Sequence, residues 1–258
     1  MPHIQAGRSR IHFVELGLAF EERLSPVVFI HGAGGSHQIW FHQLRVLGGR
    51  RKVIALDLPG HGDSNGSGAD RIEGYRDLVK EFLAKRGLHR TVLVGHSMGG
   101  AITQSFALAY PDQLAAIVLV GTGARLRVHP KIFAALRDDP AGAVGTIARS
   151  ARAPDASPEE IEQDAEAMLR TPVEVIERDL RACDAFDLME QVSAIATPTL
   201  VICGTADLMT PPKYAEYLHQ QIKGSDLSLI PGAGHMVMLE KPEEVTRAIE
   251  AFLNGLGC

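Results

Sequence analysis

Six short apolar runs, rich in β-branched residues and free of polar alternation, most constrain how this chain can fold. A strand with one solvated face alternates apolar and polar residues, so unbroken apolar runs are typical of strands buried on both faces of a parallel sheet. The runs span residues 27–31, 52–57, 91–95, 116–121, 199–204 and 227–232. Helix-like patterns separate them, near residues 36–47, 70–86, 98–109, 212–222 and 242–254.

This alternation of strands and helices predicts an α/β fold, in which a mostly parallel sheet is wound right-handed with helices on both faces. The opening segment, residues 3–20, is expected to add two antiparallel edge strands, which brings the sheet to about eight strands. The chain has 258 residues, of which 45% are hydrophobic. That is enough apolar material for one large core.

The alternation stops between residues 123 and 190, where Ala, Arg, Asp and Glu are frequent and no strand-like run occurs. The prolines of this region mark helix starts and turns, and the acidic residues after Ser157-Pro158 are typical of a capped helix N-terminus. We therefore expect a core of residues 1–122 and 191–258. Residues 123–190 are expected to form a helical cap, or lid, over the carboxyl ends of the strands, where such sheets bind ligands.

Charge and cysteine content exclude several classes of partner. The net charge of −5 argues against nucleic acid, and the apolar runs are too short to cross a membrane. The first residues lack the apolar stretch of a signal peptide. The cysteines fit neither zinc spacing nor a disulfide framework, being Cys183, Cys203 and Cys258. We expect a cytoplasmic protein with Cys203 as a buried apolar residue, and the sequence does not indicate its oligomeric state.

The residues Gly95-His96-Ser97-Met98-Gly99 match the pattern G-x-S-x-G between a predicted buried strand and a predicted helix. A serine in this context projects from a strained turn, and the two glycines let neighbouring backbones pack closely. The same residues also suit an ordinary tight turn. A catalytic role therefore requires partners elsewhere in the chain.

A serine hydroxyl is a weak nucleophile that needs a base, for which the chain offers eleven histidines. Seven are expected at the surface: His3, His12, His37, His42, His89, His129 and His219. His31 and His61 suit structural hydrogen bonding, and the ring of His96 is expected to face a different way from Ser97. His235 follows the last apolar run on a glycine loop that can return its ring over the sheet. Its alternative role is a loop histidine bonded to backbone.

A carboxylate that orients this histidine should lie between the serine and the histidine in the chain, at the end of a buried strand. Asp207 follows such a strand and is the candidate. It equally suits a helix cap or an Asx turn. Asp57 and Asp63 precede the serine, and we interpret them as structural residues that form turns.

The segment HGAGGS, residues 31–36, follows the first long strand and is expected to supply an oxyanion hole. Glycine lets a backbone N–H approach a ligand closely. We predict the N–H groups of Ala33 and Met98 as the two donors, with Gly34 as a substitute for Ala33. A simple glycine-rich turn is the alternative, and the lysine of a phosphate-binding loop is absent. The residues expected to contact substrate are Gly32, Gly34 and Met236.

Together, the segments HGAGG, DLPGHGDS, GHSMGG, GTAD and GAGH resemble the α/β-hydrolase superfamily in its usual order. The chain looks similar to bacterial carboxylesterases and their enol-lactonase relatives over nearly its whole length, least so within 123–190. The resemblance implies a triad of Ser97, His235 and Asp207, and it implies no metal or organic cofactor. A serine at position 97 disfavours the epoxide-hydrolase and haloalkane-dehalogenase branches, which use an aspartate there.

These features predict a serine hydrolase that cleaves small-molecule carboxylic esters with small to medium acyl chains through an acyl-enzyme. A lactonase or carbon–carbon bond (meta-cleavage product) hydrolase is the alternative and needs lid residues aimed at a carboxylate. The candidates for that contact are Arg125, Arg127 and Arg149, which equally suit a solvated surface. The carbon–carbon hydrolases commonly carry a tryptophan shortly after the catalytic histidine, where this chain has HMVMLE. A third hypothesis is a receptor that binds a ligand without catalysing a reaction.

Overall fold

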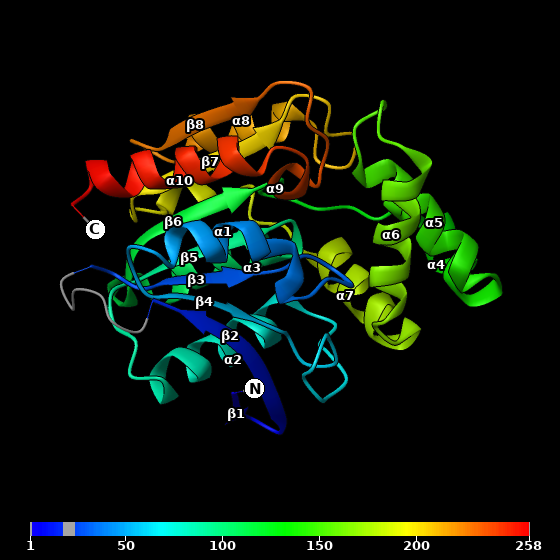
Figure 1. Cartoon of the computed structure of the whole chain (residues 1–258), viewed down its shortest axis with the longest axis horizontal. Coiled ribbons are helices and arrows are strands. Elements are labelled where there is room, and N and C mark those ends of the chain that lie inside the picture. Colours follow the sequence, from blue (N-terminus) through cyan, green and yellow to red (C-terminus); the bar gives the residue numbers. More distant parts are fainter. Residues whose placement is uncertain (1, 18–23, 258) are drawn as a thin grey trace.

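An eight-stranded sheet runs through the centre of this computed structural model, which describes residues 2–17 and 24–257 (Figure 1). The order of strands across the sheet is β1-β2-β4-β3-β5-β6-β7-β8. The strands are β1 (His3–Ala6), β2 (Ser9–Leu16), β3 (Val27–Ile30), β4 (Val53–Leu56), β5 (Thr91–His96), β6 (Leu114–Val120), β7 (Thr199–Gly204) and β8 (Asp226–Ile230).

The pairing of the strands confirms the predicted sheet. β1 pairs with β2, and β2 with β4, in antiparallel fashion, whereas the other neighbours are parallel. The antiparallel strands expected within residues 3–20 are thus present as β1 and β2. Residues 18–20 of that prediction lie outside the described residues.

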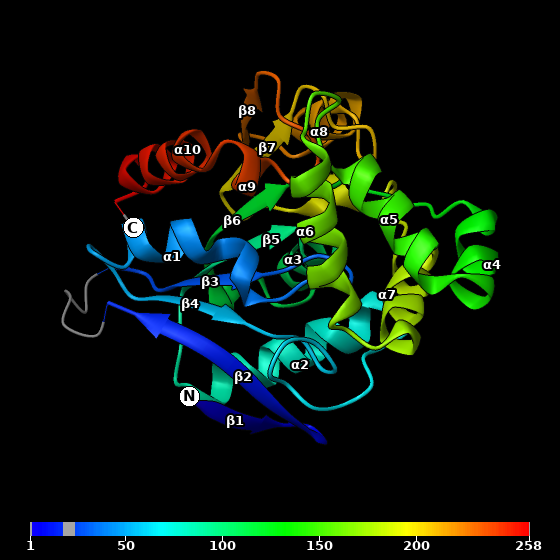
Figure 2. The same ribbon diagram turned by 45° about the vertical axis from the view of Figure 1, so that its right-hand side comes forward.

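Both faces of β3, β4, β5, β6 and β7 are buried, as their unbroken apolar runs predict. The prediction is wrong for β8, where only Ile230 is buried, because this strand lies at the edge of the sheet and pairs on one side alone. Side chains alternate between faces along a strand, so Val28 and Ile30 of β3 join one apolar cluster while Val27 and Phe29 join another. The helices α2 (Ile72–Lys85), α3 (Met98–Ala109) and α8 (Pro212–Gln221) cover the first face, and α1 (Phe41–Leu47), α9 (Val237–Glu240) and α10 (Pro242–Gly255) cover the second (Figure 2). Cys203 of β7 is buried, in agreement with the prediction.

The helices follow the predicted ranges closely. Those packed on the sheet are α1 (Phe41–Leu47), α2 (Ile72–Lys85), α3 (Met98–Ala109), α8 (Pro212–Gln221), α9 (Val237–Glu240) and α10 (Pro242–Gly255). Short 3₁₀ turns are η1 (His37–Trp40), η2 (Pro111–Gln113) and η3 (Val192–Ala194). No helix within the described ranges has both the length and the apolar character needed to cross a bilayer.

Four further helices lie between β6 and β7, beyond the carboxyl ends of the parallel strands (Figure 1). They are α4 (Pro130–Asp138), α5 (Pro140–Ala151), α6 (Pro158–Leu169) and α7 (Val173–Ala185), and we refer to them as the cap. Proline opens three of these helices, and Ser157 with Glu160 forms a capping box on α6. A backbone bridge between Arg125 and Asp187 joins the two segments that connect the cap to the sheet.

Replacing Gly145 of α5 with alanine should raise the free energy of unfolding by about 0.5–1 kcal/mol. Alanine restricts the unfolded chain, and a Cβ at this position meets nothing within 4 Å. Gly142→Ala in the same helix is the matched control, because its Cβ would lie 2.1 Å from Oδ2 of the helix-capping Asp139. Urea unfolding of both variants tests this, and equal effects would contradict it.

Candidate functional site

Ser97 occupies a turn of one residue between the end of β5 and the start of α3. Its backbone angles are φ 53° and ψ −114°, a positive φ that non-glycine residues rarely adopt. Such strain persists only where the surrounding structure enforces it, and it is frequent at functional sites. The turn therefore has the geometry in which a nucleophile projects from a strand-to-helix junction.

The two glycines of the motif are needed because backbones approach closely on either side of the serine. A Cβ at Gly95 would lie 2.1 Å from the carbonyl oxygen of Gly99, and a Cβ at Gly99 would lie 2.4 Å from that of Ile30. No side chain tolerates contacts this short. The glycines thus let α3 pack against β5 and β3 closely enough to form the turn.

His235 and Asp207 meet beside this turn, although 28 residues separate them in the chain. Nδ1 of His235 lies 2.9 Å from Oδ2 of Asp207, and both side chains are buried. Burial opposes ionisation of Asp207, but the charge of His235 and hydrogen bonds from His235 and Thr210 lower the pKa of this carboxyl below its usual value. An ionised Asp207 holds the His235 ring with Nε2 as its free nitrogen.

Thr210 is a member of this cluster that the sequence analysis missed. Its hydroxyl donates to Oδ2 of Asp207 at 2.8 Å, and its backbone N–H donates to Oδ1 at 2.8 Å. The segment TADLMT places a threonine three residues after the aspartate, a spacing typical of an Asx or capping turn. The alternative considered for Asp207, a turn-forming residue, therefore coexists with its contact to His235.

Ser97 and His235 both line one cavity of about 280 Å³, with no hydrogen bond between them in the described structure. Catalytic hydrogen bonds are often long or unformed before substrate binds, so the lack of this bond does not argue against a catalytic pair. The chain thus brings the predicted serine, histidine and carboxylate together at one site.

His96, for which the sequence indicated no role, contacts His235 directly. Its Nε2 lies 3.0 Å from the carbonyl oxygen of His235, and the two ring centroids are 4.7 Å apart. Burial, and then the neighbouring His235, lower the pKa of His96 to about 3, so its ring is neutral. A carbonyl only accepts hydrogen bonds, so Nε2 of His96 carries the proton and donates to it.

The segment predicted to supply the oxyanion hole, residues 31–36, contains a glycine-rich loop, residues 32–35 (the oxyanion loop), that lies against Ser97, since a Cβ at Gly32 would lie 3.2 Å from Cβ of Ser97. Among the described residues the N–H of Ala33 has no hydrogen-bond acceptor, whereas that of Gly34 donates to Oδ2 of Asp179 at 2.8 Å. Met98 is the first residue of α3, so its N–H has no acceptor within the helix. Ala33 and Met98 are therefore better placed than Gly34 to offer free donors.

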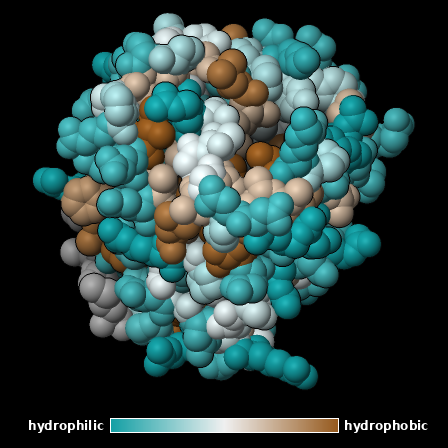
Figure 3. Space-filling model, turned by 90° about the vertical axis from the view of Figure 1, so that its right-hand side faces the viewer, coloured by the Kyte–Doolittle hydropathy of each residue, from teal (hydrophilic) through white to brown (hydrophobic). Residues whose placement is uncertain are grey.

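The cavity has mostly apolar walls contributed by both the cap and the sheet. Viewed from the cap side, apolar surface gathers near the centre of the face and hydrophilic residues surround it (Figure 3). Gly32, Gly34 and Met236, predicted to contact substrate, all line the cavity. Lining residues that the sequence analysis did not identify include Ile39, Ile147, Met168, Leu180 and Leu239. Those in the cap, Ile147, Met168 and Leu180, occupy apolar positions that resemble ordinary helix-packing positions, so the sequence carried no distinct signal for them.

None of the three arginines considered for substrate recognition offers a free guanidinium to the cavity. Arg127 lines it, but its Nη1 donates to three backbone carbonyls and its Nη2 pairs with Asp187 at 2.9 Å. Arg125 lies 3.8 Å from the same carboxylate, and Arg149 is exposed. Surface solvation and structural pairing account for these side chains.

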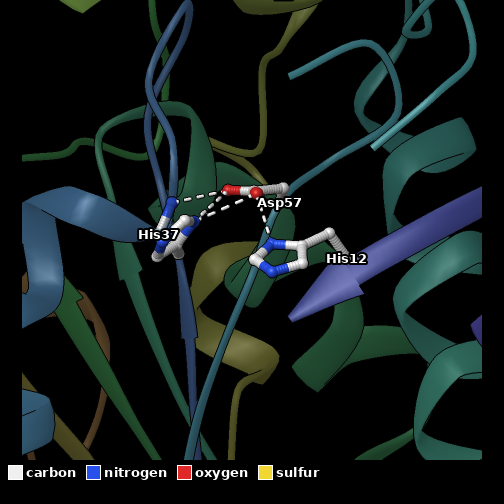
Figure 4. A group of neighbouring side chains, drawn as sticks. All are labelled: His12, His37 and Asp57. Atoms are coloured by element: carbon white, nitrogen blue, oxygen red, sulfur yellow. Dashed lines mark hydrogen bonds and ion pairs between the residues drawn. The ribbon is translucent and has the colours of Figure 1, made fainter. Parts of the chain in front are cut away.

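The structure corrects the prediction that His12 and His37 are surface residues. Both rings bond to the buried Asp57, with Nδ1 of His12 2.8 Å from Oδ2 and Nδ1 of His37 2.9 Å from Oδ1 (Figure 4). His12 lies on β2, which is the second strand of the sheet, so β1 and β4 flank it and its side chain points inward. His37 follows the oxyanion loop, and its side chain is only 17% exposed.

Asp57 joins three segments, which agrees with its predicted structural role. Besides the two rings, the backbone N–H groups of His37 and Asp63 donate to it. The potential ligand atoms of His12, His37 and Asp57 lie within 4.8 Å of one another, a spacing compatible with a metal ion. The hydrogen bonds already account for both carboxylate oxygens, and we interpret the cluster as a structural ion pair.

A family model described as the alpha/beta hydrolase family matches residues 27–248, most of the chain. The chain belongs to the α/β hydrolase family. This result confirms both the resemblance inferred from the sequence and the predicted fold.

Individual hydrolases are similar to this chain over almost its full length. A thermophilic esterase of known structure is 38% identical and aligns with a TM-score of 0.88 over 99% of this chain and 98% of its own. An (E)-2-((N-methylformamido)methylene)succinate hydrolase from Acinetobacter baylyi is 29% identical over 237 residues, covering 88% of this chain and 90% of that protein. The enol-lactonase from Burkholderia xenovorans LB400 shares the fold, with a TM-score of 0.91 over 98% of this chain and 100% of its own at 23% identity.

The pairing of His37 with Asp57 should stabilise the protein most between about pH 4 and pH 6.5, the usual pKa values of the two groups in an unfolded chain. Burial opposes both charges, but Asp57 raises the pKa of His37, while hydrogen bonding from His37 and the charge of His31 lower that of Asp57. The stabilisation is lost at higher pH as His37 deprotonates, and at lower pH as Asp57 becomes protonated.

The measurement is the difference in free energy of unfolding between wild type and His37→Gln across this pH range. His89→Gln, at an exposed position, controls for the loss of a histidine in general. A difference that does not vary with pH would show that the pair is not ionised in the folded protein.

Proposed function

We propose that this protein is a serine hydrolase that cleaves carboxylic esters of small to medium acyl chain, with Ser97 as nucleophile. The observation that carries the proposal is the convergence of three parts on one apolar cavity. These are the strained Ser97 turn, the buried pair of His235 and Asp207, and the glycine loop with an unpaired N–H. The similarity to a thermophilic esterase supports the choice of ester bonds.

In the proposed reaction, Oγ of Ser97 attacks the ester carbonyl as Nε2 of His235 takes its proton. The N–H groups of Ala33 and Met98 hold the oxyanion, and each such donor contributes about 3 kcal/mol to the transition state. His235 then donates the proton to the departing alcohol. Water, deprotonated by His235, hydrolyses the acyl-enzyme and restores Ser97.

Asp207 stays ionised through this cycle and stabilises the imidazolium that forms at His235. The pKa of Asp207, lowered by its neighbours despite burial, favours that charge state. Thr210 and its backbone hold both carboxylate oxygens in place, which restricts the orientation of the imidazole. The proposed reaction needs no reactant other than the ester and water.

We further propose that residues 123–190 act as the cap that sets acyl-chain preference, on a core of residues 1–122 and 191–258. Ile147 of α5, Met168 of α6 and Leu180 of α7 line the cavity from the cap side. Apolar side chains in these positions favour an acyl chain by removing it from water. Their bulk also limits the length of chain that fits.

Ser97→Ala should lower kcat for p-nitrophenyl butyrate by at least about 10³-fold while the protein stays folded, because the nucleophile is lost. Ser105→Ala removes another serine hydroxyl, from helix α3, which follows Ser97, and should leave kcat close to wild type. Full activity in Ser97→Ala would refute the assignment. A wild-type enzyme that hydrolyses lactones but no simple ester would favour the lactonase alternative instead.

Among p-nitrophenyl esters, kcat/KM should be higher for acetate and butyrate than for octanoate, because a cavity of about 280 Å³ lined on one side by the cap limits chain length. Ile147→Ala enlarges the cavity and should shift the preference toward octanoate. Val46→Ala, an apolar truncation on α1 at a partly exposed position outside the cavity, is the control. A kcat/KM that rises steadily to octanoate in wild type would contradict the proposed size limit.

A further inference from the structure

Asp179 is a buried carboxylate on the cap helix α7 that bonds to three segments of the α/β core. Its Oδ2 lies 2.8 Å from the backbone nitrogen of Gly34 and 2.7 Å from Nε2 of His61, and the hydroxyl of Tyr75 donates to its Oδ1. In both ribbon views, α7 lies closer to the carboxyl ends of β3 and β4 than α4 does (Figures 1 and 2). A cap residue thus reaches the oxyanion loop directly.

The neighbour His61 supplies the positive charge that a buried carboxylate requires. Nδ1 of His61 faces the carbonyl oxygen of Pro59 at 3.1 Å, while Nε2 faces Asp179. The Pro59 carbonyl only accepts hydrogen bonds, so Nδ1 carries a proton, and a second proton on Nε2, shared with Asp179, makes the ring an imidazolium. Burial opposes this charge, but Asp179 raises the pKa of His61 above its ordinary value.

The cap holds the Gly34 peptide groups from both sides. The hydroxyl of Thr171, just before α7, donates to the carbonyl oxygen of Gly34 at 3.2 Å, while Asp179 accepts from its N–H. Gly34 has φ +65°, and a Cβ there would lie 2.7 Å from Cε of Met168 on α6. The loop conformation is therefore one that only glycine adopts readily, and the cap packs tightly against it.

An oxyanion hole works only if its donors are fixed before the reaction. The loop 32–35 contains three glycines and is intrinsically free to change conformation. Inside the loop, the Gly32 carbonyl, which shares a peptide group with the Ala33 N–H, accepts from the N–H of Gly35 and from Nδ1 of His31. The next peptide group, between Ala33 and Gly34, has no hydrogen bond within the loop. The bond to Asp179 restrains this second peptide group, and with it the turn that presents the Ala33 N–H.

We propose that Asp179 is a positioning residue for the oxyanion hole, which holds the Ala33 N–H toward the reacting carbonyl by binding the Gly34 N–H, with Thr171 in support. The inference rests on the proposed function of Ser97. It assigns to the cap a role in the chemical step as well as in forming the cavity wall.

Asp179→Asn tests this proposal, because the amide keeps the shape of the side chain but has one acceptor oxygen for three donors. Loss of an oxyanion donor costs about 10²–10³ in kcat, so a misdirected donor should lower kcat by about 10–100-fold with KM within about threefold. A trifluoromethyl ketone that forms a hemiketal oxyanion on Ser97 should lose affinity by the same factor as kcat/KM falls. A role in folding alone would not produce this parallel loss.

Two further variants control the experiment. Glu177→Gln removes a charge from the same helix, where Glu177 pairs with Arg181 and Arg137, and should leave kcat within about twofold of wild type. Thr171→Val keeps the shape of a buried side chain and removes the second bond to Gly34. It should lower kcat by about 3–10-fold, the value of one hydrogen bond.

A folded Asp179→Asn enzyme with kcat within twofold of wild type would overturn the proposal, as would a fall in kcat without loss of inhibitor affinity. If Asp179→Asn does not fold, Thr171→Val becomes the test of the proposal. A Thr171→Val enzyme with unchanged kcat and unchanged inhibitor affinity would then overturn the proposal. The proposed function fails separately, through absent ester turnover in wild type or full activity in Ser97→Ala. If the wild type is active and Ser97→Ala is inactive, the proposed function stands, and the Asp179 variants then test the positioning role alone.

Discussion

The close approach of α3 to the parallel strands is the constraint on which the site depends. Gly95 and Gly99 permit it, since any Cβ at either position would overlap a backbone carbonyl. The approach leaves a single residue, Ser97, to join β5 to α3, and that residue takes a positive φ. Packing of the core therefore provides the energy that keeps the serine in its strained and projecting conformation.

The cap is bonded to both loops that surround the serine. Besides the contacts of Asp179 and Thr171 with the oxyanion loop, the N–H of Met236 donates to the carbonyl of Ala151 at the end of α5. Glu240 accepts from the N–H groups of Gly234 and Ala153 with one oxygen, 3.0 Å from each nitrogen. Opening the cap as a rigid lid would break these hydrogen bonds. The geometry therefore favours a cap that stays in contact with the loops around Ser97.

Three buried carboxylates, each paired with histidine, connect segments that are distant in the chain. Asp207 pairs with His235, Asp57 with His12 and His37, and Asp179 with His61. A buried charge is tolerated only with an oppositely charged or hydrogen-bonding partner. Each pair therefore restricts its segments to one relative arrangement, and all three lie close to the loops that form the site.

The sequence by itself determined the sheet and the helices around it, and it indicated the three residues proposed as a triad, because those signals are local. Apolar runs set the buried strands, and G-x-S-x-G with glycine-rich strand ends marks Ser97, Asp207 and His235. Only the tertiary structure revealed the burial of His12 and the contact of Asp179 with Gly34, which spans 145 residues. From sequence alone, a charged residue on a helix is expected to face solvent. Only its partners from distant parts of the chain, which the tertiary structure brings together, allow it to be buried.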